Sequence, residues 1–191
     1  MKKYFGVSPL PEGYVLWDEI NLTQNTKLLV WINVLSILLF LPFVPLILSL
    51  SSQTVVEYSF WGGFLLGMIL IIPVHEGIHG LFFRRFGNGK VAYKFHGWAF
   101  SASMEGTFFS KAAYLVIGAS PVVVLSLVIG IFALVWPTPV GKLLAWVLFT
   151  VQFASAAGDI YVVWRFRNLP PDALVEDTGV GMKVFSKTPR S

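Results

Sequence analysis

The sequence contains no cysteine. This absence excludes disulfides, thiolate metal ligands and a cysteine nucleophile, so any metal site must use His, Asp or Glu side chains. Charged residues are also scarce, at 13% of 191 residues, whereas they make up about 25% of a soluble globular domain. Hydrophobic residues account for 55% of the chain. This composition is typical of an integral membrane protein.

Four apolar segments are long enough to cross a bilayer, whose hydrocarbon core requires about 20 apolar residues in a helix. They run from about residue 28 to 50, 59 to 83, 112 to 136 and 140 to 164. The sequence therefore predicts one all-α integral membrane domain over residues 1–191, with four transmembrane helices. A polar tail is expected from residue 165 to 191.

Basic residues are distributed unevenly among the segments between these spans. The links between spans one and two and between spans three and four contain no Lys or Arg before Lys142. The middle loop and the tail are rich in both, at Arg84, Arg85, Lys90, Lys94, Lys111, Arg165, Arg167, Lys183, Lys187 and Arg190. By the positive-inside rule we expect both termini, the middle loop and the tail in the cytoplasm. The net charge of +4 is then a topology signal. We expect membrane lipid around the chain and no nucleic-acid partner.

The loop between the second and third spans, residues 84–111, is expected to be partly extended and to form a β-hairpin. Gly87-Asn88-Gly89-Lys90 is a turn signal, after which Val91, Tyr93 and Phe95 alternate as in a β-strand. The extended aromatic character continues through residues 98–102. Two interpretations are open: an aromatic belt at the lipid headgroups, or a strand that pairs with a substrate segment.

The second span contains the motif His75-Glu76-Gly77-Ile78-His79. Residues four apart lie one above the other on a helix, so His75 and His79 present two imidazoles to one point, with Glu76 beside them. Neutral imidazole binds zinc, zinc lowers the pKa of its water toward about 7, and a glutamate can accept the proton. An ionisable residue at mid-bilayer costs roughly 2.5 to 3.5 kcal/mol, which disfavours a chance grouping. We predict His75 and His79 as ligands of Zn²⁺ and Glu76 as the catalytic base.

Zinc requires at least one more protein ligand. Asp159 is the only other acidic residue within a predicted span. It precedes Arg165 by about 9 Å of helix, and His79 precedes Arg84 by about 7.5 Å, so both lie at a similar depth. We predict Asp159 as the third ligand, with His96 and Glu105 of the middle loop as rival candidates. The alternative without a metal is that Asp159 simply extends to the membrane interface.

Two prolines remove helical hydrogen bonds near these residues. Pro73 frees the carbonyl of Ile69, and Pro121 frees the carbonyl of Ile117. Irregular backbone at membrane depth is tolerated where it lines a cavity or is buried in protein. Either proline could equally be an ordinary helix kink.

Several short segments in this order carry a resemblance to a known family: Leu10-Pro11-Glu12-Gly13-Tyr14, residues 75–80, Phe95-His96-Gly97-Trp98, Ala119-Ser120-Pro121 and Gly158-Asp159. Through them the chain resembles a family of small prokaryotic membrane proteins classed as zincin-type peptidases and related to the site-2 protease group of intramembrane metalloproteases. The resemblance implies a location in the prokaryotic cell membrane. In the site-2 group the third ligand is an aspartate in a later span within a Leu-Asp-Gly setting, whereas Asp159 is followed by Ile160.

The leading hypothesis is a zinc-dependent endopeptidase that cuts a membrane-embedded or membrane-proximal peptide near the cytoplasmic face. A non-catalytic metal-binding or divalent-ion transport protein is the main alternative, and an inactive scaffold that binds substrate without cutting it is a third. Glu76 discriminates between them. A transporter has less reason to place a carboxylate that is not a ligand beside two histidines.

Overall fold

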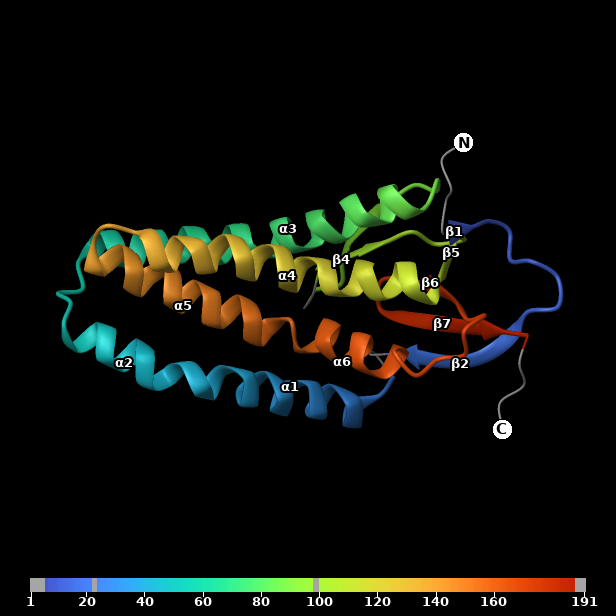
Figure 1. The fold of residues 1–191 in the computed structure, drawn as a ribbon, viewed down its shortest axis with the longest axis horizontal. Coiled ribbons are helices and arrows are strands. Elements are labelled where there is room, and N and C mark those ends of the chain that lie inside the picture. Colours follow the sequence, from blue (N-terminus) through green and yellow to red (C-terminus); the bar gives the residue numbers. More distant parts are fainter. Residues whose placement is uncertain (1–5, 22–23, 98–99, 188–191) are drawn as a thin grey trace.

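The computed structural model describes residues 6–21, 24–97 and 100–187. Its helices lie side by side along the long axis of the molecule, and its strands gather at one end of the helical bundle (Figure 1). The first and last strands lie at that same end.

The helices coincide with the predicted spans to within a few residues. The first apolar segment, Thr26–Ser52, consists of α1 (Thr26–Phe40), a 3-10 turn (Leu41–Phe43) and α2 (Val44–Ser52). The next two are α3 (Tyr58–Phe86) and α4 (Lys111–Val135). These three segments are long and apolar enough to cross a membrane.

The predicted fourth span is a broken helix. It consists of α5 (Pro139–Ser155) and α6 (Ala157–Phe166), which meet at a bend of 44°. The pair has the length and composition of a fourth span only if both helices cross as one bent unit.

The outer surface of the bundle is apolar. Trp31, Ile69 and Leu134 are 70%, 68% and 69% exposed, respectively. Soluble monomers rarely expose contiguous apolar surface on this scale. The helices are therefore compatible with a lipid environment.

The expectation of an all-α fold was incomplete, because five strands form an antiparallel sheet at one end of the bundle. Their order is β1 (Gly6–Val7), β5 (Phe108–Ser110), β6 (Leu174–Asp177), β7 (Gly181–Ser186) and β2 (Val15–Asn21). The segment expected to be a polar tail, residues 165–191, thus supplies two strands. These strands are short and come from three distant parts of the chain, so no local period revealed the sheet.

The sheet packs on the ends of the helices. Phe109, Val175 and Val184 are fully buried and belong to one core cluster with Tyr114 of α4 and Phe166 of α6. This core fixes the position of the sheet relative to the helices that carry the predicted site.

The predicted hairpin in the middle loop is confirmed. It pairs β3 (Ala92–Phe95) with β4 (Phe100–Ser103) in antiparallel register. The part of the expected extended stretch at residues 98 and 99 lies outside the described residues.

Candidate metal centre and catalytic cavity

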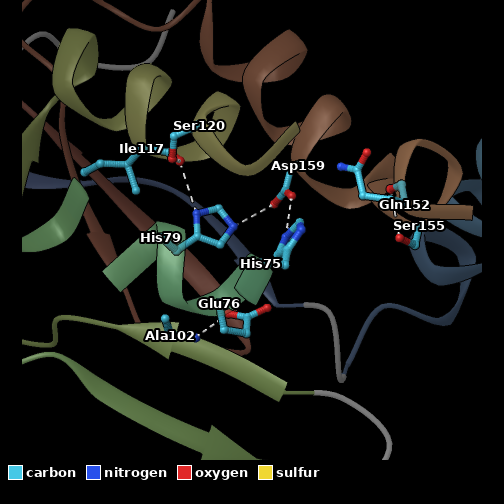
Figure 2. A network of polar contacts seen from close by, with 9 residues as sticks. All are labelled: His75, Glu76, His79, Ala102, Ile117, Ser120, Gln152, Ser155 and Asp159. Atoms are coloured by element: carbon cyan, nitrogen blue, oxygen red, sulfur yellow. Dashed lines mark hydrogen bonds and ion pairs between the residues drawn. The ribbon is translucent and has the colours of Figure 1, made fainter. Parts of the chain in front are cut away.

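Three of the predicted site residues meet between α3 and α6. His75 and His79 project from one face of α3, and Asp159 lies opposite them in the first turn of α6 (Figure 2). His75 Nε2 is 3.0 Å from Asp159 Oδ2, and His79 Nε2 is 3.4 Å from Asp159 Oδ1. The carboxylate thus faces both imidazoles at once.

The donor atoms of this group fit a zinc ion. One ligand atom from each residue can be chosen so that all three lie within 4.8 Å of one another. Two ligands at about 2.0 to 2.1 Å from a tetrahedral ion are about 3.4 Å apart. The observed separations of 3.0 and 3.4 Å are close to that spacing. Two imidazole nitrogens and a carboxylate oxygen are also a donor set that zinc accepts.

The break between α5 and α6 sets the position of Asp159. Helix α5 ends at Ser155, and the chain bends by 44° before α6 begins at Ala157. Ala156 and Ala157 are 2% and 1% exposed. Such small side chains at the bend allow neighbouring helices to approach closely.

A backbone carbonyl fixes the orientation of His79. Its Nδ1 lies 3.1 Å from the carbonyl oxygen of Ile117 in α4. This carbonyl lacks its usual helical donor because Pro121 has no N–H, and the hydroxyl of Ser120 also donates to it at 2.8 Å. Since a carbonyl can only accept, Nδ1 must carry the proton. In the neutral imidazole, the form that binds a metal, the lone pair of Nε2 is then available on the side of Asp159.

Glu76 is held by the hairpin. Its Oε2 accepts a hydrogen bond of 2.7 Å from the backbone N–H of Ala102 in β4 (Figure 2). Glu76 is not part of the group of donor atoms that could hold a metal. Among the described residues none donates a hydrogen bond to its Oε1. One carboxylate oxygen is thus anchored, and the other is free to accept a proton.

A cavity of about 140 Å³ lies beside these residues. Its lining includes two buried groups that no sequence pattern identified, Tyr114 of α4 and Asp177 at the end of β6. The Tyr114 hydroxyl donates a hydrogen bond of 2.5 Å to Asp177 Oδ2, and the N–H of Gly179 donates one of 2.8 Å to Oδ1. Strand pairing brings Asp177 here, so its position in the sequence carried no signal.

The rival ligands His96 and Glu105 lie outside this group. His96 Nε2 is 2.9 Å from the hydroxyl of Ser101, and Glu105 forms an ion pair of 2.6 Å with Lys94. Within the described part of the chain, the residues grouped for metal binding are His75, His79 and Asp159. Their roles as ligands, and that of Glu76 as a base, stay predictions.

A family model described as "Putative zincin peptidase" matches residues 68–174, which is 107 of the 191 residues. The matched region contains His75, Glu76, His79 and Asp159, and it ends just before Asp177. No curated protein and no solved structure matches the chain. The resemblance to zincin-type peptidases is confirmed, whereas the relation to the site-2 group stays a prediction. With more than half of its length matched, the chain belongs to the family that this model describes.

Proposed function

We propose that the protein is a zinc-dependent endopeptidase that hydrolyses a peptide bond in a membrane-embedded or membrane-proximal segment, near the cytoplasmic face of a prokaryotic membrane. The observation that carries this proposal is the position of Glu76. It stands beside three converging donor residues, with one oxygen held by Ala102 and the other free. The family match supports peptidase chemistry.

His75, His79 and Asp159 are the residues that would hold the ion. Zinc, when bound, supplies a water of lowered pKa and polarises the substrate carbonyl. Glu76 accepts a proton from the attacking water through Oε1 and returns it to the leaving amine nitrogen. The hydrogen bond from Ala102 keeps the carboxylate pointed into the cavity. The carboxylate therefore needs little reorientation before it accepts the proton.

The outer edge of β4 offers a binding site for an extended substrate backbone. In an antiparallel pair, residues alternate between hydrogen-bonded and non-hydrogen-bonded positions. Ala102 directs its N–H to Glu76, and therefore away from Tyr93, its partner in β3. Phe100 lies two residues earlier in β4, so its N–H and C=O point to the same edge of the strand, away from β3. A peptide strand added at this edge has its own peptide bonds next to Glu76.

The same arrangement favours a peptidase over an ion transporter. A transport site needs ligands for the ion, and His75, His79 and Asp159 already supply them. Glu76 lies outside that group and is tied to a hairpin strand that can bind a peptide. Transport alone gives no reason for this contact.

A membrane location is supported by the three long apolar segments and by their exposed apolar side chains. Arg84 and Arg85 end α3 on the same side of the bundle as the site, and Arg165 lies in the last turn of α6. Basic residues at this end agree with a cytoplasmic orientation under the positive-inside rule.

Zinc content and peptide cleavage of purified variants test the proposal. Wild type should hold about one zinc per chain, and His75→Ala should lose it, because zinc sites need at least three protein ligands. Glu76→Gln should keep the zinc and lose cleavage about 100-fold to 10,000-fold, the usual contribution of general acid–base catalysis. Glu105→Gln removes a carboxylate outside the cavity and serves as the matched control. Loss of zinc from Glu76→Gln would show that Glu76 is a ligand and overturn the mechanism.

A further inference from the structure

The charges that line the cavity do not balance. Glu76, Asp159 and Asp177 all line it, and none of its described lining residues is a lysine or arginine. The two positive charges of a bound zinc ion would be balanced by the two negative charges of Glu76 and Asp159 alone. Asp177 is only 9% exposed and is in no ion pair among the described residues. A third carboxylate is therefore buried without a cationic partner.

Hydrogen bonding explains the position of Asp177 but not its charge. An asparagine could also keep both contacts, with its oxygen accepting from Gly179 and its amide donating to the Tyr114 oxygen. It would do so without the cost of burying a charge. Burial raises the pKa of the Asp177 carboxyl, which reflects this cost. The hydrogen bonds that Asp177 forms with the turn and with Tyr114 thus do not explain why this side chain is a carboxylate and not an amide.

The turn after Asp177 faces the strand that we assign to substrate binding. Gly179 has a φ of +84°, and a Cβ at this residue would lie 2.8 Å from the hydroxyl oxygen of Ser101 in β4. Ser101 immediately precedes Ala102, whose N–H holds Glu76. Side chains directly opposite each other on paired strands share one face. A substrate side chain that lies on the Ser101 face of β4 therefore points toward the turn that follows Asp177, and Ser101 and Asp177 line the same cavity.

We propose that Asp177 is a specificity residue that binds a cationic side chain, lysine or arginine, close to the scissile bond of the substrate. The inference rests on the proposed peptidase function. A guanidinium or ammonium group would supply the missing positive charge, favour the ionised carboxylate and form a charge-assisted hydrogen bond with it. Asp177 lies beyond residue 174, where the family match ends, so this preference belongs to the part of the chain outside that match.

Peptide binding to the zinc-loaded Glu76→Gln protein tests this assignment without turnover. The probes are short apolar peptides with one arginine placed at each position in turn, and twins in which citrulline, a neutral isostere, replaces the arginine. At the position that reaches Asp177, the arginine peptide should bind about 10-fold to 100-fold more tightly than its twin. Adding Asp177→Asn should bring the ratio of the arginine-peptide affinity to the citrulline-peptide affinity close to one. The affinity for the citrulline peptide itself should stay unchanged.

Two further variants separate charge from structure. Asp177→Glu retains the carboxylate and should keep a preference for arginine. Glu176→Gln removes the neighbouring carboxylate, which accepts from the N–H of Gly106, and should leave the ratio unchanged. Equal affinity for both peptides of every pair, or an equal loss of both affinities in Asp177→Asn, would overturn the assignment. Failure of the peptidase function itself would appear separately, as a wild-type protein that binds zinc but cleaves no peptide.

Discussion

The ring of His79 is held on both sides, with Nδ1 against the carbonyl of Ile117 and Nε2 against Asp159. A metal bound to Nε2 must therefore lie in the space that Asp159 shares with His75. His96 and Glu105 are engaged by Ser101 and Lys94 instead. The geometry at the level of single residues favours Asp159 as the third ligand.

Zinc content of three alanine variants tests this preference. Asp159→Ala should lose most of its zinc, because a carboxylate ligand is removed from a site with few alternatives. His96→Ala and Glu105→Ala should keep about one zinc per chain. Native-like zinc affinity in Asp159→Ala, together with metal loss in either of the other two variants, would identify a different third ligand.

The glycine that follows the motif reflects close contact between two elements. A Cβ at Gly80, directly after His79, would collide with the Tyr93 hydroxyl of β3. The hairpin can therefore lie directly on α3, where β4 reaches Glu76. Helix and hairpin act together to place the proposed base.

Helix α4 contributes to the proposed metal site through its backbone. Pro121 lies inside α4, and the carbonyl that it leaves without a helical donor is the one that orients His79. Partners of this kind, behind a metal ligand, fix its tautomer and orientation. The proline thus has a role beyond bending the helix.

Replacing Pro121 with alanine should weaken zinc binding about 10-fold to 100-fold, the usual effect of disturbing such a partner. The new N–H at position 121 would compete with His79 for the Ile117 carbonyl. Alanine favours the helix by about 3 kcal/mol relative to proline, so unfolding would not explain a loss of affinity. Zinc titration of the variant gives the measurement, and Pro45→Ala at the start of α2 is the control. Unchanged affinity in Pro121→Ala would contradict the role assigned to the carbonyl.

The whole molecule brings distant parts of the chain to one end. Strands β1 and β2 precede the first apolar segment, β5 precedes α4, and β6 and β7 follow α6, yet all five belong to one sheet. The ion pair of 2.6 Å between Asp18 of β2 and Arg165 of α6 adds a further link. A chain whose two ends join the same sheet agrees with an even number of membrane crossings.

Reporter fusions test the proposed orientation. Fusions at residues 54 and 138, which lie between apolar segments at the opposite end from the sheet, should report the outer side of the membrane. Fusions at residue 88 and after residue 187 should report the cytoplasm, in keeping with the distribution of basic residues. A cytoplasmic signal from residue 54 would contradict the four-span topology and the depth assigned to the site.

Features that depend on neighbouring residues were visible in the sequence by itself. Apolar length marked the helices, the alternation at residues 91–95 marked the first strand of the hairpin, and the four-residue spacing of His75 and His79 placed both on one face of a helix. The turn signal at residues 87–90 precedes that strand and does not join the two strands of the hairpin. The loss of the donor to the Ile117 carbonyl also follows directly from proline chemistry. Each of these features is determined within a few residues of the chain.

Only the tertiary structure decided what these local features contact. That Ile117 faces His79, that Ala102 holds Glu76, and that Asp177 lines the cavity beside Tyr114 all depend on residues 26 to 63 positions apart. Strands as short as β1 and β5 have too few residues to show a period of two, and their pairing depends on the packing of a shared core. Hydrogen bonds between segments so distant leave no pattern in either segment alone, so the sheet and the wall that it adds to the cavity emerge only when the chain folds.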